Sequence, residues 1–250
     1  MQETLVFLHG LGSTKNTFNE LKVFLEGEKI ETFDLPGHGE SDMINQMSFD
    51  SLCDWLNRQI VEPSIILGHS LGAIISLAFA AKYPGKVKKL ILLDGGYLYA
   101  RNFNVSLEDE TKGAIQFIKD QKFPSAQAVI ESEKSEVSRW SNFLEEATLK
   151  RFKKTSDNQY ELIIQPETAS IYTQLSYDFL VPTLSIPITL IAAKEPKDLE
   201  SIRQKAIKDL KNTLPQLIVK RIDTSHDLVV EDPQRVANLI KESIYINTPK

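Results

Sequence analysis

The sequence contains a single cysteine, Cys53, among its 250 residues. One cysteine cannot form a disulfide within the chain, and alone it cannot supply the thiolates of a structural metal site. The simplest interpretation of Cys53 is a small buried group on a helix. The sequence also lacks a His-x-x-x-His pair, and no phosphate loop or dinucleotide-binding glycine pattern follows its first apolar segment. It therefore predicts neither a metal nor another cofactor.

Positive charge is not in excess either, since 29 lysine and arginine residues face 34 aspartate and glutamate residues, a formal net charge of −5. Without a basic stripe, nucleic acid is not an expected partner. No apolar stretch approaches the about 18 residues of a membrane span, and the first residues carry no basic leader. We expect a globular cytoplasmic protein without a membrane span, in an oligomeric state that the sequence leaves open.

Six short apolar segments, rich in strand-forming residues, recur along the chain. They are nearly continuous hydrophobic runs, which is typical of parallel strands buried on both faces. The predicted strands are TLVFLH (4–9), IETFDL (30–35), SIILGH (64–69), KLILLD (89–94), ITLIAA (188–193) and LIVKRI (217–222). Helices are expected at 17–26, 49–60, 71–82, 199–213 and 233–244, with Ser48 and Asp232 suited to cap two of them. This alternation predicts a doubly wound α/β sheet.

One long connection, residues 95–180, interrupts the alternation and shows no good strand. Its apolar positions recur at spacings of three and four, which is typical of a helix face. These positions are Val137, Trp140, Leu144 and Ala147. Because so long a connection cannot be a bare loop in a compact domain, we predict a helical cap, residues 96–180, over the carboxyl edge of a core formed by residues 1–95 and 181–250. A helical embellishment without a role in substrate access is the alternative.

The strongest local motif is Gly68-His69-Ser70-Leu71-Gly72, at the junction of a predicted strand and a predicted helix. A turn this tight holds the serine in strained backbone geometry, and glycines on either side remove Cβ atoms that would collide. The Ser70 hydroxyl would then stand above the sheet at a helix N-terminus. Ser70 is therefore the candidate nucleophile, and an ordinary strand-to-helix turn is the alternative.

A second glycine motif, His9-Gly10-Leu11-Gly12-Ser13, ends the first predicted strand. Its glycines allow the backbone to fold back toward Ser70. The amides of Leu11 and Leu71 are then candidates for an oxyanion hole, which would stabilise the negative charge that develops in acyl transfer.

Of the four histidines, His226 follows the last predicted strand, at the sheet edge where a general base for Ser70 would be needed. His9 and His38 belong to glycine-containing loops, and the side chain of His69 is expected to point away from Ser70. His226 is the candidate base, and a surface loop histidine is the alternative.

Together these features resemble the α/β-hydrolase fold family over nearly the whole chain. The resemblance rests on the loop around Leu11, the segment DLPGHGES (34–41), the Ser70 turn, the cap and His226, in the family's order. It implies that Ser70 attacks an acyl carbon and that His226 takes and returns the proton. Because the first strand begins within the first few residues, where the family usually has two further strands, we expect a truncated, all-parallel sheet of six strands. Numbered along the chain, their spatial order should be second, first, third, fourth, fifth, sixth.

The acid that the family uses to orient its histidine is ambiguous in this sequence. The usual place, after the next-to-last strand, offers Glu195 slightly early and Asp198 slightly late. The family's other position is the end of the preceding strand, which is Asp94. We favour Asp94 because a strand end is rigid, and both other residues stay open.

The sequence as a whole predicts a serine hydrolase, most simply a carboxylesterase acting on a small to medium apolar acyl substrate. Thioesters, lactones, carbon–carbon bonds and cofactor-free haloperoxidase chemistry remain open, because one fold serves all of them. Aromatic residues of the cap are candidates for the substrate pocket; they are Tyr97, Tyr99, Phe103 and Trp140. The alternative function is a hydrolase-like sensor that binds a small molecule and signals to a partner protein.

Overall fold

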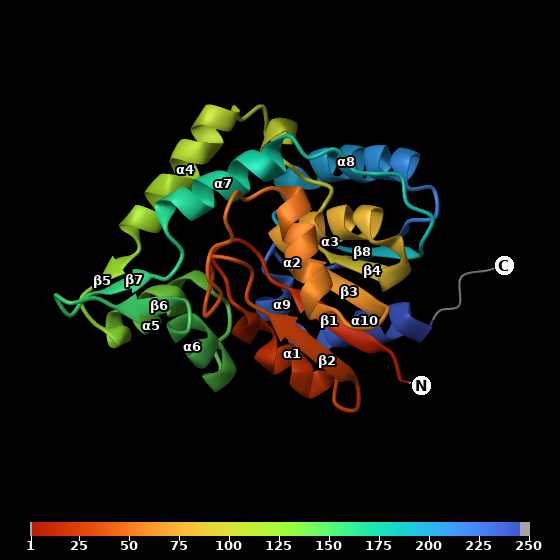
Figure 1. The fold of residues 1–250 in the computed structure, drawn as a ribbon. Helices are drawn as coiled ribbons and strands as arrows, with labels where there is room; N and C mark the ends of the chain where they lie inside the picture. Colours follow the sequence, from red (N-terminus) through yellow and green to blue (C-terminus); the bar gives the residue numbers. More distant parts are fainter. Residues whose placement is uncertain (1, 246–250) are drawn as a thin grey trace.

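A computed structural model describes residues 2–245, and a six-stranded sheet forms its centre (Figure 1). The strands are β1 (Thr4–Leu8), β2 (Lys29–Phe33), β3 (Ser64–His69), β4 (Val87–Leu93), β8 (Ile188–Ala193) and β9 (Ile218–Ile222). Their order is β2-β1-β3-β4-β8-β9, and every neighbouring pair is parallel. The predicted parallel sheet and its strand order are confirmed.

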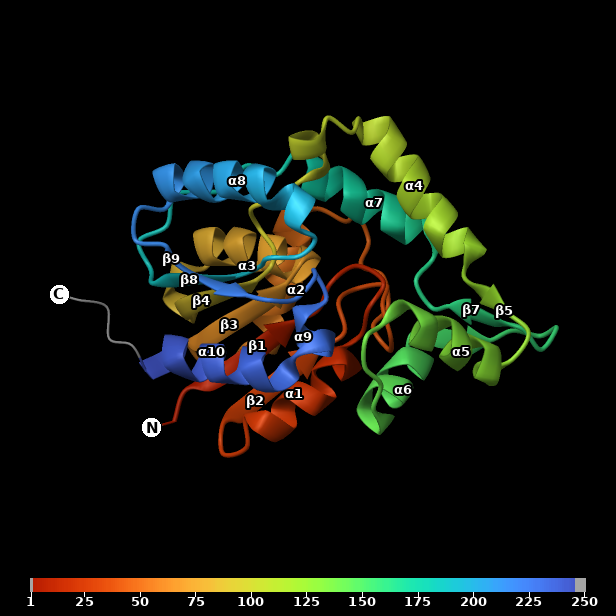
Figure 2. The same cartoon turned by 180° about the vertical axis from the view of Figure 1, so that it is seen from behind.

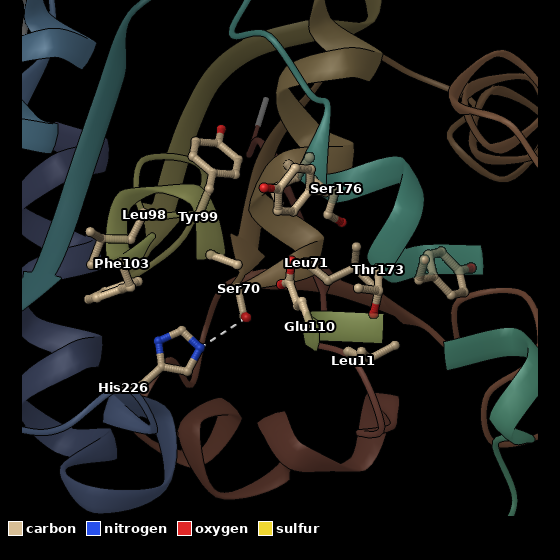
Figure 3. A pocket seen from close by; sticks show the side chains of 14 residues that line it. Leu11, Ser70, Leu71, Leu98, Tyr99, Phe103, Glu110, Thr173, Ser176 and His226 are labelled. Atoms are coloured by element: carbon tan, nitrogen blue, oxygen red, sulfur yellow. Dashed lines mark hydrogen bonds between the residues drawn. The ribbon is translucent and has the colours of Figure 1, made fainter. Parts of the chain in front are cut away.

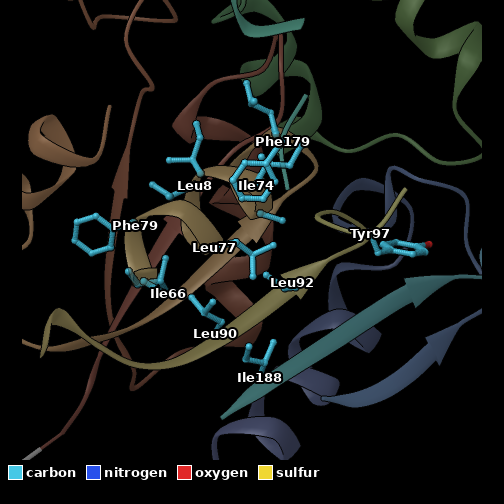
Figure 4. Close-up of a cluster of buried hydrophobic side chains, with 14 of the residues drawn as sticks. Leu8, Ile66, Ile74, Leu77, Phe79, Leu90, Leu92, Tyr97, Phe179 and Ile188 are labelled. Carbon is cyan, nitrogen blue, oxygen red and sulfur yellow. The ribbon is translucent and has the colours of Figure 1, made fainter. Parts of the chain in front are cut away.

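Successive side chains of the central strands enter two different apolar cores. In β1, Val6 and Leu8 pack into one core and Leu5 and Phe7 into the other. The first core lies under α2 (Phe49–Gln59), α3 (Leu71–Lys82) and α8 (Glu200–Thr213), and Figure 4 shows part of it. The second lies under α1 (Asn19–Phe24), α9 (Leu228–Glu231) and α10 (Pro233–Tyr245). Burial on both faces explains why these strands are continuously hydrophobic.

Local capping explains where several of these helices begin. The Ser48 hydroxyl accepts from the Ser51 amide at 3.1 Å, and the Ser51 hydroxyl accepts from the Ser48 amide at 2.9 Å, which starts α2. Asp232 accepts from the Arg235 amide at 2.9 Å at the start of α10. Cys53 is buried in α2, as expected. Short 3₁₀ helices complete this part of the fold: η1 (Lys15–Phe18), η2 (Pro84–Lys86) and η4 (Lys197–Leu199).

Residues 96–180, called the insertion below, separate β4 from β8. The insertion contains η3 (Ala100–Phe103), α4 (Leu107–Asp120), β5 (Lys122–Phe123), α5 (Ala126–Glu136), α6 (Asn142–Leu149), β6 (Phe152–Lys154), β7 (Tyr160–Leu162) and α7 (Pro166–Tyr177). Figures 1 and 2 show it beyond the carboxyl ends of the sheet strands. Within residues 2–245, no helix has the length and apolar character needed to cross a membrane.

Two expectations for the insertion are wrong. It contains an antiparallel sheet in the order β5-β7-β6, and strands of two or three residues are too short to show a period-two pattern. In addition, Val137 and Trp140 lie outside any helix. Ser141 caps α6 by accepting from the Leu144 amide at 3.2 Å, so a new helix starts after Trp140. Only Leu144 and Ala147 of the predicted face are buried in a helix.

Candidate active site

Ser70 occupies the turn between β3 and α3 with a positive φ of 52°. Such a conformation costs about 1–3 kcal/mol for a residue other than glycine, so the surrounding packing must hold it. A Cβ atom on Gly72 would lie 2.2 Å from the Leu8 carbonyl oxygen, and one on Gly68 would lie 2.4 Å from the Ala73 nitrogen. Both glycines are therefore required by the close approach of α3 to β1 and β3.

A continuous chain of hydrogen bonds connects Ser70, His226 and Asp94. The His226 Nε2 atom lies 2.9 Å from the Ser70 hydroxyl oxygen (Figure 3). The His226 Nδ1 atom lies 2.8 Å from Asp94 Oδ2. These are three residues that the sequence analysis selected, and the fold brings them together from the ends of β3, β4 and β9.

Asp94 is itself held by two donors on its other oxygen. The Tyr97 hydroxyl donates to Asp94 Oδ1 at 2.6 Å, and the Ala193 amide donates to the same atom at 2.9 Å. Burial alone raises the pKa of this carboxyl, but the bond to His226 and these two donors lower it further than burial raises it. The net effect is a lowered pKa, so Asp94 is ionised at neutral pH.

The pKa of His226 moves in the opposite direction from that of Asp94. Desolvation by the surrounding protein lowers the pKa of the imidazole, while the hydrogen bond and the charge of Asp94 raise it. Asp227 adds to the increase, and the net pKa lies above the ordinary value of 6.5. His226 is therefore the histidine of this site whose protonated form the protein stabilises.

The side chains of the other three histidines form hydrogen bonds with backbone groups. His9 Nε2 accepts from the Leu35 amide at 3.0 Å, and burial lowers the pKa of His9 to about 4. His38 Nε2 accepts from the Gly12 amide at 3.1 Å, and burial lowers its pKa to about 3. His69 donates from Nε2 to the His226 carbonyl oxygen at 2.9 Å, so its side chain points to the His226 loop. Burial lowers its pKa as well.

Leu11 and Leu71, the candidates for an oxyanion hole, both border the cavity that contains Ser70. Leu71 is the first residue of α3, where backbone amides have no partner within the helix. The loop of Leu11 is held by both backbone groups of Gly12. The Gly12 amide donates to His38, and the Gly12 carbonyl oxygen accepts from Arg151 Nε of the insertion at 3.1 Å.

The cavity above Ser70 has a volume of about 350 Å³ (Figure 3). Core residues form its floor, and the insertion supplies Tyr99, Phe103, Glu110 and residues of α7. Tyr97 and Trp140, which were expected to contact substrate, do not line it. Tyr97 is buried behind the site against Asp94, and the Trp140 Nε1 atom donates to Glu145 at 3.3 Å.

The alternative acids lie elsewhere in the structure. Asp198 is exposed in η4, and the nearest cation to the Glu195 carboxylate is Lys197 at 3.9 Å. Neither forms a hydrogen bond with His226 within the described residues. Across residues 2–245, no three acidic, histidine or cysteine side chains cluster as metal ligands would.

Three contacts of this site were not predicted from the sequence. They are the bond from Tyr97 to Asp94, the bond from Arg151 to Gly12, and the position of Glu110 in the cavity wall. The Asp-Gly-Gly-Tyr order at 94–97 could have suggested the first, because only two glycines separate the acceptor from the donor. Nothing in the local sequence of Arg151 or Glu110 indicates where the insertion folds back.

Comparison with known proteins agrees with this geometry. Residues 3–178 match the alpha/beta hydrolase fold family. The chain belongs to this family, which confirms the resemblance seen in the sequence. The structure is similar to an E-2-(acetamidomethylene)succinate hydrolase, with a TM-score of 0.82 at 19% identity, covering 98% of this chain and 92% of that one. It is also similar to a marine microorganism esterase, with a TM-score of 0.71 at 23% identity, covering 97% and 95%. At these identities the likeness shows the fold.

Curated relatives match over a shorter part of the chain. A pimeloyl-[acyl-carrier protein] methyl ester esterase of Neisseria meningitidis is 35% identical over 86 residues, which is 34% of this chain and 33% of that protein. Lipase 1 of Psychrobacter immobilis is 34% identical over 116 residues, which is 44% of this chain and 37% of that protein. The aligned part of the chain thus spans about a third of the length of these relatives.

Proposed function

We propose that this protein is a serine hydrolase that cleaves carboxylic esters of small to medium acyl groups. The observation that carries the proposal is the hydrogen-bonded chain Ser70–His226–Asp94 at the floor of a cavity, with 2.9 Å and 2.8 Å between successive partners. The names of the esterase and lipase relatives support the same class of reaction.

In the proposed reaction, His226 Nε2 takes the proton of Ser70 as the Ser70 oxygen attacks the acyl carbon. Asp94 holds the Nδ1 proton and stabilises the imidazolium that forms. The amides of Leu11 and Leu71 donate to the oxygen that becomes negative. His226 then returns the proton to the leaving alcohol. Water, with His226 again as the base, attacks the acyl group on Ser70, which releases the acid and restores the Ser70 hydroxyl.

The insertion is proposed to act as the cap that selects the acyl group. Its side chains Tyr99 and Phe103 give the cavity apolar surface, which suits an acyl chain with few polar groups. In this proposal, residues 1–95 and 181–250 carry out the reaction, and residues 96–180 select the acyl group.

A fluorophosphonate label and a short nitrophenyl ester test the proposal together. We expect covalent labelling at Ser70 and measurable ester turnover in the native protein. Ser70→Ala should lose the label and lower turnover by several orders of magnitude, because only binding and oxyanion contributions remain. Ser13→Ala, in the loop of Leu11, is the control and should keep the label.

Three results would count against the assignment. Labelling that persists in Ser70→Ala would place the nucleophile elsewhere. Labelling without turnover of any ester, thioester or lactone would favour the small-molecule sensor. No labelling of the folded native protein would refute an activated serine.

A further inference from the structure

Glu110 is the only acidic side chain among the described residues that line the Ser70 cavity. It lies in the first turns of α4, and the view in Figure 3 draws it near Leu71 and Thr173, on the other side of Ser70 from His226. The other lining groups are mostly apolar or hydroxyl-bearing. Glu110 therefore forms part of the wall around the space that the bound substrate would fill.

This carboxylate has no partner within residues 2–245. Its Oε2 atom is buried without a hydrogen bond, and the side chain forms no ion pair. Buried polar atoms are nearly always paired, because an unpaired one loses its hydration without compensation. A carboxylate in the wall of a cavity with one oxygen left unpaired therefore points to a partner that arrives with a ligand.

The tyrosine donors of the cavity wall are already used by backbone carbonyl groups. The three tyrosine hydroxyls of the cavity wall donate away from Glu110: Tyr99 to Gly96 at 3.1 Å, Tyr172 to Pro36 at 2.9 Å and Tyr177 to Val105 at 3.1 Å. They cannot turn to Glu110 without leaving those carbonyl oxygens unpaired.

The nearest guanidinium, Arg101, is committed in the same way. It donates to the carbonyl oxygens of Tyr177 and Phe179, and it stacks over the Tyr99 ring at 4.0 Å. Burial raises the pKa of Glu110, and the charge of Arg101 offsets only part of that increase. The native fold thus leaves the Glu110 carboxylate incompletely stabilised.

A purely structural role at the helix N-terminus is already filled by the two preceding acids. Glu108 pairs with Lys112 at 2.5 Å, and Asp109 accepts from the Ser106 hydroxyl at 2.7 Å. Both are exposed, as expected for residues that complement the helix dipole. Glu110 differs from them because it faces the cavity.

We propose that Glu110 is a specificity-determining residue, and that it selects esters whose bound group carries a hydrogen-bond donor, a protonated amine above all, over esters that carry a carboxylate. This inference rests on the proposed hydrolase function. An ammonium group supplies three donors and the opposite charge, and charge-assisted hydrogen bonds are the strong ones. A substrate carboxylate would instead place a like charge against Glu110.

The test compares three nitrophenyl esters of equal acyl length, ending in an ammonium, a methyl or a carboxylate group. The native protein should give the highest kcat/KM on the ammonium ester and the lowest on the carboxylate ester. Glu110→Gln keeps the shape and removes the charge, and it should lower the ammonium-to-carboxylate ratio of kcat/KM at least about tenfold. Glu108→Gln makes the same change on the exposed face and should leave the ratio as it is.

The rate of Ser70 labelling by a small neutral fluorophosphonate, together with a thermal melt, separates a change in specificity from a loss of the site or of the fold. A folded Glu110→Gln variant that keeps the native ratio, or an equal change in Glu108→Gln, would overturn the inference while the proposed function stands. Turnover of none of the esters by a protein that still labels at Ser70 would overturn this substrate class. Absence of both labelling and turnover would refute the proposed function itself.

Discussion

Replacing Asp94 by asparagine tests the orienting carboxylate with little change in shape. Two donors, Tyr97 and the Ala193 amide, converge on Asp94 Oδ1, so the oxygen of an asparagine must take that position. Its NH₂ group then occupies the Oδ2 position, 2.8 Å from His226 Nδ1. Nδ1 must become the acceptor, which puts the imidazole proton on Nε2. That is the atom that has to accept the proton of Ser70.

The expected cost follows from this forced tautomer. In the serine-protease triad the same substitution keeps the geometry and lowers kcat about 10⁴-fold. That factor corresponds to about 5 kcal/mol of transition-state stabilisation, at about 1.36 kcal/mol for each tenfold change. Since the two Oδ1 donors keep their acceptor and asparagine tolerates the positive φ of this position, 41°, the variant should remain folded.

Turnover of a nitrophenyl ester, the rate of Ser70 labelling and a thermal melt measure the three parts of this prediction. Asp198→Asn makes the same chemical change at an exposed residue and should cost little. A loss of kcat below tenfold in folded Asp94→Asn would refute the tautomer argument. A large loss in Asp198→Asn would move the acid to the position that the family more often uses.

Three further predictions follow from other contacts of the site. First, kcat/KM should fall as pH falls through the pKa of His226, because the imidazolium cannot accept a proton. Since Asp94 raises this pKa above 6.5, the acid midpoint of a pH–rate profile should lie above 6.5. The midpoint of the Asp94→Asn variant should be lower. Second, Tyr97→Phe removes one of two donors to Asp94 Oδ1, so steady-state kinetics should show a loss of kcat of about tenfold or less. This loss is far smaller than the one expected for Asp94→Asn. A loss as large as that of Asp94→Asn would mean that Tyr97 has another role. Third, Gly72→Ala would put a Cβ atom 2.2 Å from the Leu8 carbonyl oxygen, so a thermal melt should show strong destabilisation, and a native-like melt would contradict the close approach.

The sheet could be predicted because its order depends on patterns that are local in the sequence. A strand buried on both faces, such as β3, is hydrophobic at every position, and the turn at Ser70 needs glycines on either side. Ser70 and His226 could be selected in this way, since each follows a strand end. Asp94 could be favoured but not separated from Asp198, because the fold of the segment after β8 is not encoded in a local pattern.

The insertion was harder to predict for a different physical reason. Its contacts depend on where the chain returns after long excursions, as when Arg151 reaches Gly12 across 139 residues of sequence. Its strands are two or three residues long, and the spacing of Val137 and Trp140 matched a helix that ends before them. Tyr97 was interpreted as a pocket residue because its aromatic ring suits one, whereas its hydroxyl group decides its place beside Asp94.

The contact between Arg151 and the Gly12 carbonyl oxygen limits how this protein can be recombined with its relatives. The insertion leaves and re-enters the core at two neighbouring strands, β4 and β8, which makes it an attractive unit for building chimeras. Here the insertion also supports the loop of Leu11, and Ser141 of the same segment donates to Glu20 of α1 at 2.8 Å. An insertion grafted from a relative would therefore need a residue equivalent to Arg151. A graft chosen only because its two junctions match would leave the Gly12 carbonyl oxygen without its partner.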